Sequence, residues 1–262
     1  MKKIILILTG ILLLGTQLFA IDNSLEKIKK QGKIIVGLDD TFAPMGFRDT
    51  EGNIIGFDID LATEVAKRIG VKVEFLPCDW DGILLNLNSK KIDLIWNGLT
   101  VTEKRKENII FSEPYFIGNQ IIITTPNTGI KSSNDLSGKT VGTQTGSSSY
   151  FALEKTANFK NIKEVRNYPE NVSALLDLKN GRLDAVVIDS VTGEYYLTIQ
   201  NRKSNKIVYI AIPENLNTEQ EKIAVGIRKT DIELKKTIDT TLDEMRADGT
   251  FDSIYKKWFG GK

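Results

Sequence analysis

Arg105 and Thr100 have the types and the spacing to hold a carboxylate. The guanidinium of Arg105 is planar and permanently charged, so it can donate two parallel hydrogen bonds to one carboxylate. Thr100 can add its hydroxyl and N–H groups. Thr102 is expected to cap a helix that begins at Glu103 and presents Arg105 from its first turns. The alternative is a strand, a turn and a helix whose arginine is solvated.

A free amino acid carries an ammonium group as well as a carboxylate. Two further groups in the sequence could bind these charges. Asp189 follows an apolar strand and can bind an ammonium group or, equally, cap the helix that starts nearby. The loop 144–149, Gln-Thr-Gly-Ser-Ser-Ser, precedes an expected helix. Its N–H groups can bind an anion, and the alternative is an ordinary serine cap. This loop lacks the lysine of a nucleotide-binding loop, which argues against a nucleotide ligand.

Phe42, Trp80 and Asp39 lie where strands are expected to end. Two aromatic rings can clamp a flat or cationic side chain, with cation–π contacts of roughly 0.5–2 kcal/mol each. Asp39 can then meet the far end of that side chain. For an isolated aromatic residue, burial in the core is the competing interpretation.

The composition excludes several classes of site. The 262 residues include no histidine and one cysteine, Cys78. Histidine-based acid–base catalysis, Ser–His triads, the usual zinc sites and an intramolecular disulfide are therefore excluded. The chain has 35 Lys+Arg against 34 Asp+Glu, which argues against nucleic acid as a partner. No catalytic residue, metal or cofactor is expected, and a binding protein is favoured over most enzymes.

Residues 1–20 have the pattern of a signal peptide. Lys2 and Lys3 precede a short apolar core, and Ala20 stands at a plausible cleavage point. The alternative is an uncleaved anchor, but the apolar core is shorter than the ~20 residues that a spanning helix needs. No cysteine near residue 20 could carry a lipid. We expect the mature protein to be free in the periplasm.

Strands and helices alternate along the mature chain, which predicts an α/β protein with parallel sheets. The segment 38–52 is expected to be irregular because it contains proline, glycine and turn residues. Strands are expected at 34–37, 71–76, 92–96, 121–125, 139–142, 164–168, 185–188, 207–210 and 223–227. Helices are expected at 25–30, 57–69, 80–89, 147–155, 170–179, 191–200, 231–247 and 251–258.

Two segments of the chain resemble each other. The pattern LLxLxxxKID at 84–93 recurs as LLxLxxxRLD at 175–184, always 91 residues later, and GKIIVG at 32–37 resembles GKTVG at 138–142. Either match alone is compatible with chance, but both occur in the same order. At the offset of 91, Gly98 corresponds to Asp189. Ligands of open α/β sheets lie outside the carboxyl ends of the strands. Two such sheets that face each other would therefore place both of these edges on one cleft.

Six motifs resemble the extracellular solute-binding proteins of ABC transporters for polar amino acids, family 3. They are TFAPMGF (41–47), GFDIDL (56–61), WDGI (80–83), GLTVTEKR (98–105), FSEPY (111–115) and YKKWFG (255–260). The resemblance covers nearly all of the mature chain. It implies a type II periplasmic-binding fold, with two α/β lobes, a two-strand hinge and a ligand cleft. The implied first lobe is 21–119 plus 219–262, and the second is 120–218.

The resemblance also implies roles for ten residues. The ligand carboxylate is assigned to Arg105, Thr100, Ser148 and Ser147, the ammonium to Asp189 and Gly98, and the side-chain pocket to Asp39, Phe42, Trp80 and Gln144. The expected function is to bind a free polar amino acid and deliver it to a membrane permease, as a monomer. Arginine or lysine is the expected ligand, with glutamine or cystine as the alternative. A periplasmic dehydratase on the same fold is the alternative class.

Overall fold

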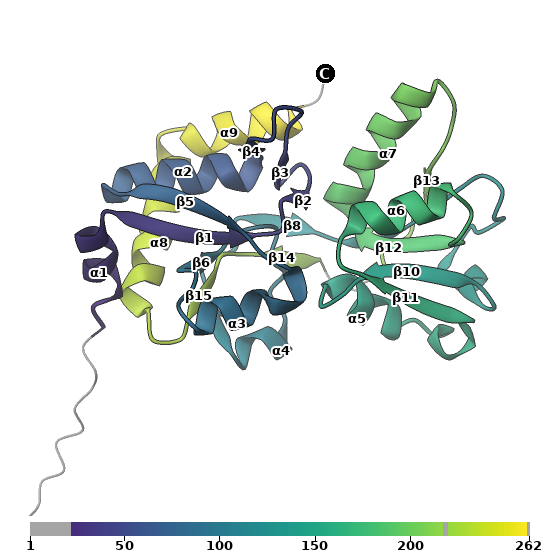
Figure 1. The fold of residues 1–262 in the computed structure, drawn as a ribbon, viewed down its shortest axis with the longest axis horizontal. Helices are drawn as coiled ribbons and strands as arrows, with labels where there is room; N and C mark the ends of the chain where they lie inside the picture. Colours follow the sequence, from purple (N-terminus) through teal and green to yellow (C-terminus); the bar gives the residue numbers. More distant parts are fainter. Residues whose placement is uncertain (1–21, 217–219, 261–262) are drawn as a thin grey trace, which may run out of the picture.

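The computed structural model describes residues 22–216 and 220–260. The predicted signal peptide at 1–20 and the predicted lobe boundary at 218–219 lie outside the described residues. Two lobes, each built around a β-sheet, lie side by side with a waist between them (Figure 1). The predicted α/β class and two-lobe arrangement are confirmed.

The first lobe contains a five-stranded sheet in the order β5-β1-β6-β15-β7. Its strands are β1 (Lys33–Leu38), β5 (Lys72–Pro77), β6 (Leu94–Ile95), β7 (Ile109–Phe111) and β15 (Gly226–Arg228). β1 is parallel to β5 and β6, whereas β15 is antiparallel to β6 and β7. The lobe also contains α1 (Ser24–Gln31), α2 (Phe57–Ile69), η1 (Trp80–Gly82), α3 (Ile83–Asn88), α4 (Glu103–Lys106), α8 (Ile232–Ala247) and α9 (Thr250–Phe259).

The second lobe repeats this sheet in the order β11-β10-β12-β9-β13. Its strands are β9 (Gln120–Thr124), β10 (Thr140–Gln144), β11 (Glu164–Tyr168), β12 (Ala185–Asp189) and β13 (Ile210–Ala211). β10 is parallel to β11 and β12, and β9 is antiparallel to β12. The helices of this lobe are η2 (Ser133–Leu136), α5 (Ser148–Glu154), η3 (Phe159–Asn161), α6 (Asn171–Lys179) and α7 (Ser190–Ser204).

A small two-stranded sheet lies between the lobes. β8 (Phe116–Gly118) runs directly into β9 of the second lobe, and β14 (Glu221–Ile223) pairs with it in the antiparallel sense. Ile223 also forms an isolated bridge with Thr100. This pair of strands is the predicted two-strand hinge.

The internal repeat extends to single hydrogen bonds. The amide of Lys91 donates to the carbonyl of Asn86 at 3.0 Å, and the amide of Arg182 donates to the carbonyl of Asp177 at 2.9 Å. Each pair lies at the same offset of 91 residues. Lys90 and Gly181, also related by this offset, both have left-handed backbones with φ of 63° and 73°. The two lobes therefore share the same turn geometry in this repeated segment.

The structure corrects the sequence-based prediction at three segments. The strand predicted at 207–210 is displaced, because β13 covers only Ile210–Ala211. Residues 38–52 are not irregular throughout, because β2 (Thr41–Phe42) and β3 (Gly46–Arg48) join β4 (Ile54–Ile55) in a three-stranded sheet. The single strand predicted at 223–227 is divided between β14 and β15, which pair in different sheets. The apolar run is continuous, so its pattern does not reveal that its two halves meet different partners.

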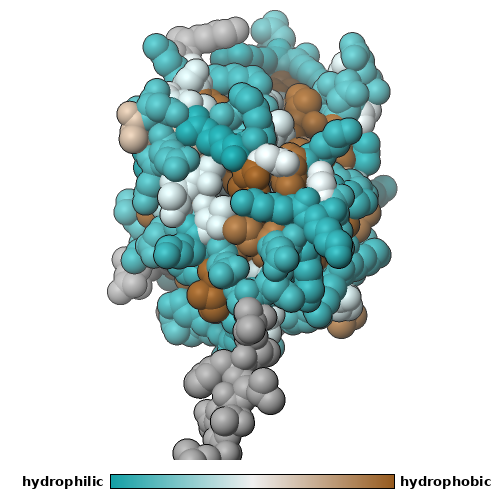
Figure 2. Space-filling model, turned by 90° about the vertical axis from the view of Figure 1, so that its left-hand side faces the viewer, coloured by the Kyte–Doolittle hydropathy of each residue, from teal (hydrophilic) through white to brown (hydrophobic). Residues whose placement is uncertain are grey.

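Each lobe has its own hydrophobic interior. In the first lobe, the apolar face of α2 packs with β1 and α8 around buried residues such as Phe57 and Leu242. In the second, apolar residues of β9 and β12 face both layers of helices. Figure 2 shows the end of the first lobe, where hydrophilic side chains cover most of the face and hydrophobic residues form small separate patches. No described helix is long and apolar enough to cross a membrane.

Candidate functional site

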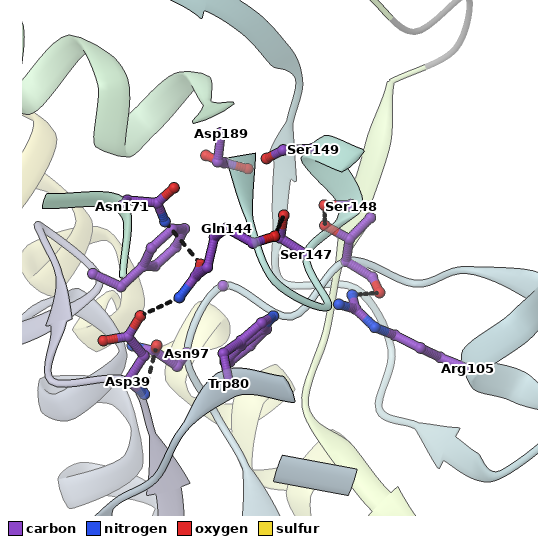
Figure 3. A pocket seen from close by; sticks show the side chains of 13 residues that line it. Asp39, Trp80, Asn97, Arg105, Gln144, Ser147, Ser148, Ser149, Asn171 and Asp189 are labelled. Carbon is purple, nitrogen blue, oxygen red and sulfur yellow. Dashed lines mark hydrogen bonds between the residues drawn. The ribbon is translucent and has the colours of Figure 1, made fainter. Parts of the chain in front are cut away.

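All ten predicted site residues line one cavity between the lobes. Its empty volume is about 340 Å³. Figure 3 shows side chains that converge on this cavity from both lobes. The lining residues are Asp39, Phe42, Trp80, Asn97, Gly98, Thr100, Arg105, Gln144, Ser147, Ser148, Ser149, Asn171 and Asp189.

The carboxyl ends of the parallel strands position the site. Asp39 follows β1, Gln144 ends β10 and Asp189 ends β12, while Asn97 and Gly98 follow β6. Parallel strands that run in the same direction end at one edge of their sheet, and the two sheets turn these edges toward each other. The geometry that the repeat predicts is therefore present.

Arg105 lies in the cavity as a buried cation. Thr102 caps α4 as predicted, because its hydroxyl accepts a hydrogen bond from the amide of Arg105 at 3.2 Å. The guanidinium donates through Nη1 to the carbonyl of Thr100 at 2.7 Å and through Nη2 to the carbonyl of Gly146, in the other lobe, at 3.3 Å. Burial lowers the pKa of Arg105 to about 10, so the group remains charged at neutral pH.

Arg105 contacts carbonyl groups rather than a carboxylate. Among the described residues, no carboxylate lies within 4.0 Å of its guanidinium nitrogens in an ion pair. Its Cζ lies 5.7 Å from the centre of the Trp80 ring, within cation–π range. Trp80 therefore helps to hold Arg105 as well as lining the cavity.

Asp189 combines both roles that its position allows. Its Oδ1 accepts a hydrogen bond from the amide of Val191 at 3.0 Å and caps α7. Its Oδ2 accepts a long hydrogen bond of 3.5 Å from Nε2 of Gln120. Burial, and secondly the nearby carboxylate of Glu221, raise the pKa of Asp189 to about 7. A cation placed beside Oδ2 would relieve this cost of burial.

Asp39 is fixed by hydrogen bonds on both oxygens. Its Oδ1 accepts from the amide and the hydroxyl of Thr41, at 2.9 and 2.7 Å. Its Oδ2 accepts from Nε2 of Gln144 in the other lobe at 2.7 Å. Burial raises the pKa of Asp39, although these hydrogen bonds oppose the shift.

The hydroxyl residues of the cavity differ in what they contact. Thr100 and Ser148, from different lobes, have hydroxyl oxygens 3.1 Å apart, and Thr100 also donates to Glu221 of the hinge at 3.2 Å. The hydroxyl of Ser147 instead donates to the carbonyl of Gln144 at 2.8 Å. Ser147 therefore uses its hydroxyl to shape its own loop.

Gly98 is required by close packing. Its φ is 62°, and a Cβ at this position would lie 2.6 Å from Cε1 of Phe42. Its amide donates to Oδ2 of Asp58 at 2.7 Å, and Tyr115 donates to the same oxygen at 2.9 Å. Full burial raises the pKa of Asp58 to about 7. This buried aspartate therefore holds the backbone beneath Phe42.

Asn97, Ser149 and Asn171 line the cavity but were not among the predicted residues. Asn97 accepts a hydrogen bond from the amide of Asp39 at 3.1 Å, and Ser149 donates to Oε1 of Gln120 at 2.6 Å. The repeat could have identified Asn171, because it lies 91 residues after Trp80. Applying the offset to Trp80, as well as to Gly98, would have placed it at the cleft.

A larger acidic cavity adjoins the inner one. It has an empty volume of about 950 Å³ and shares Asp39 and Trp80 with the inner cavity. Its lining residues include four further acidic residues and one basic residue, namely Asp40, Asp79, Asp81, Glu170 and Lys91. The nearby carboxylates, after burial itself, raise the pKa of Glu170.

The lobes also touch away from the cavity. The hydroxyl of Tyr196, on α7, donates to the carbonyl of Thr41 in the first lobe at 2.8 Å. The rings of Phe47 and Tyr195 lie 5.6 Å apart between centres. These contacts join the small three-stranded sheet of the first lobe to the second lobe.

Comparison with known proteins identifies the family. The model for bacterial extracellular solute-binding proteins, family 3, matches residues 34–261. This chain belongs to that family. The predicted type II periplasmic-binding fold is confirmed by solved relatives that match both lobes.

Three relatives show the range of ligands named for similar proteins. The L-cystine-binding protein of Escherichia coli is 34% identical over 244 residues, covering 92% of this chain and 88% of the relative. A substrate-binding protein of an ABC uptake transporter from Streptococcus pneumoniae, solved with histidine, has a TM-score of 0.83 at 38% identity, covering 92% and 97%. An ancestral arginine-binding protein bound to arginine has a TM-score of 0.80 at 42% identity, covering 87% and 98%.

Proposed function

We propose that this protein binds a free amino acid with a cationic side chain and delivers it to the permease of an ABC transporter. The observation that carries the proposal is the arrangement of charge in the cavity. Arg105 of the first lobe and Asp189 of the second are both buried, and neither forms an ion pair within the described residues. A zwitterion supplies the missing partner to each.

The proposed contacts follow the chemistry of a zwitterion. The ligand carboxylate lies at Arg105, with the hydroxyls of Thr100 and Ser148 beside it. Its ammonium lies at Oδ2 of Asp189, and the backbone of Gly98, which lines the same cavity, adds to its contacts. Ser147 lies in the cavity wall beside the carboxylate, but its hydroxyl and its amide both donate to the carbonyl of Gln144, at 2.8 and 3.3 Å, so it gives the ligand no free donor in this arrangement.

The proposed side-chain pocket is formed by Phe42, Trp80, Asp39 and Gln144. The buried carboxylate of Asp39 and the acidic outer cavity favour a positive side chain. Relatives named for arginine support this choice, whereas the relative named for cystine keeps cystine as the alternative ligand, together with glutamine.

The proposed mechanism is closure of the two lobes around the ligand. A zwitterion contacts Arg105 and Asp189 at once in the closed form alone, so binding energy favours that form. We place the lobe boundaries at residues 119 and 219, next to the hinge strands β8 and β14. The closed complex docks on the permease as a monomer.

We propose a periplasmic location, which follows from the predicted signal peptide and from periplasmic relatives. We also propose that the protein is not an enzyme, because similar proteins are named for binding. Within the described residues, no group of three or more potential ligands could hold a metal ion.

A melting-temperature screen tests the proposed ligand class. A ligand that binds only the folded protein at 100 times its Kd adds about 2.7 kcal/mol of stability. We expect arginine or lysine to raise Tm most among arginine, lysine, histidine, glutamine and cystine. If none of the twenty amino acids or cystine raises Tm, the proposed function is wrong. A larger shift with glutamine or cystine would replace the cationic ligand alone.

Mass spectrometry of the same samples separates binding from catalysis. The binding proposal predicts that each ligand is recovered intact after prolonged incubation. Steady consumption of the stabilising ligand would establish the dehydratase-like alternative.

A further inference from the structure

We propose that Asn171 is a specificity-determining residue, whose Oδ1 accepts a hydrogen bond from the end of the ligand side chain. It selects side chains that end in a group with donors only, such as a guanidinium or an ammonium. This inference rests on the proposed function, since it assumes that an amino acid occupies the cavity.

Asn171 has a buried acceptor with no partner. The residue is 2% exposed, begins α6 and lines the inner cavity. Its Oδ1 has no hydrogen-bond partner among the described residues. Buried polar atoms are nearly always paired, so an orphaned acceptor in a cavity wall points to a donor on the molecule that fills the cavity.

The orientation of the Asn171 amide is set by its neighbours. Its Nδ2 donates to Oε1 of Gln144 at 2.8 Å. Gln144 in turn donates through Nε2 to Oδ2 of Asp39 at 2.7 Å and to the carbonyl of Pro169 at 3.0 Å. Figure 3 shows this chain of side chains, with the Asn171 oxygen turned away from Gln144.

The two amides cannot reverse without losing hydrogen bonds. The carbonyl of Pro169 accepts only, so Nε2 of Gln144 must face it, whatever the protonation of Asp39. Oε1 of Gln144 must then face Asn171, which turns Nδ2 of Asn171 toward Gln144. The free atom of Asn171 is therefore its oxygen.

The hydrogen-bonded series Asp39, Gln144 and Asn171 leaves only hydrogen-bond acceptors facing this part of the pocket. Asp39 and Asn171 both present acceptor oxygens, and Gln144 uses its Nε2 within the protein. A ligand group with N–H donors satisfies these oxygens. A ligand carbonyl oxygen would instead face these acceptor oxygens, and no hydrogen would lie between them. The buried oxygens would stay unpaired, so the protein would discriminate strongly against such a ligand.

Calorimetry with arginine and citrulline tests the inference, because citrulline replaces one terminal nitrogen of arginine by a carbonyl oxygen. In the unchanged protein we expect arginine to bind at least tenfold more tightly. In Asn171→Leu, which keeps the size but removes the acceptor, we expect arginine to weaken at least fivefold and citrulline less than twofold. Asn180→Leu, the same change at the exposed end of α6, should leave both affinities unchanged.

Asn171→Ala provides a second variant, and the same loss of arginine preference is expected. Circular dichroism identifies which of the two variants is folded. If a folded variant keeps the arginine-to-citrulline ratio of the unchanged protein, the assignment of Asn171 is wrong while the binding function stands. If the unchanged protein binds neither arginine nor lysine, the cationic ligand itself is wrong.

Discussion

Arg105 carries a full charge into a site where its guanidinium donates to carbonyl oxygens and faces the Trp80 ring, with no ion pair among the described residues. We predict that Arg105→Ala weakens amino acid binding at least thirtyfold, or about 2 kcal/mol, because the ligand carboxylate is left buried without its cation. Titration calorimetry measures this change. Arg202→Ala, at an exposed position on α7, serves as the control. A loss of less than threefold at Arg105 would remove it from the site.

Asp189 should make binding depend on pH. Burial raises the pKa of its carboxyl to about 7, and a bound ammonium lowers it, so binding releases a proton. Affinity should therefore fall as pH falls below about 7, with about a tenfold weaker Kd at pH 6 than at pH 8. The chain has no histidine whose titration would mask this effect.

The matched variant for this prediction is Asp189→Asn. It should bind weakly at every pH and show a flat profile. An unchanged pH dependence in this variant would assign the titration to another carboxyl, such as Asp58 or Asp39.

For single residues, the sequence predicted which side chains line the cavity better than it predicted their hydrogen-bond partners. Residue type and motif identified ten of the thirteen residues that line the cavity. They did not reveal that Ser147 turns its hydroxyl to its own loop or that Asp189 caps a helix and faces the cavity at once. These details depend on rotamers and on neighbours far away in the chain.

The repeated turn after α3 and α6 gives a prediction for single elements. Lys90 has φ of 63°, a conformation that favours glycine, and Gly181 occupies the same place in the other lobe. Lys90→Gly should stabilise the protein by about 0.5–1 kcal/mol in urea denaturation. Ser89→Gly, where φ is −78°, should destabilise it by a similar amount.

The loop after β6 allows a second test. Gly98→Ala combines left-handed backbone strain with a Cβ that lies 2.6 Å from Phe42, so we expect a lower Tm and at least a tenfold loss of affinity. Gly138→Ala has φ of 71° but open space around its Cβ. This control should lower stability by about 1 kcal/mol and leave affinity unchanged. Equal affinities for both variants would show that Phe42 does not shape the pocket.

Helices and strands with a clear apolar periodicity could be predicted from the sequence, whereas strands of two or three residues could not. The apolar positions of α2 and the glycine at residue 70 fix its core face and its end. The two-residue strands β2 and β4 contain too few positions for alternation to be visible. The division of 223–227 between two sheets depends on where the hinge lies, which is a property of the tertiary fold.

For the molecule as a whole, the lobe contacts outside the cavity should contribute to closure. Tyr196→Phe removes a hydrogen bond between the lobes, so we expect Kd to rise about fivefold, or about 1 kcal/mol, for every ligand alike. Tyr209→Phe removes a comparable hydrogen bond within the second lobe. This control should lower Tm without changing Kd. A change in ligand preference for Tyr196→Phe would instead place Tyr196 in the binding pocket.

The repeated segment in the two lobes has a consequence for the direction in which the cleft holds its ligand. At matching places the first lobe offers Trp80 and Gly98 where the second offers Asn171 and Asp189. If both lobes carried the same residue at the two places of each pair, the cleft would be symmetric. Such a site would suit a symmetric molecule or hold an asymmetric one in two orientations. Because the lobes differ at these places, the two walls of the cleft are unlike, so a ligand whose two ends differ in charge is held in a single direction.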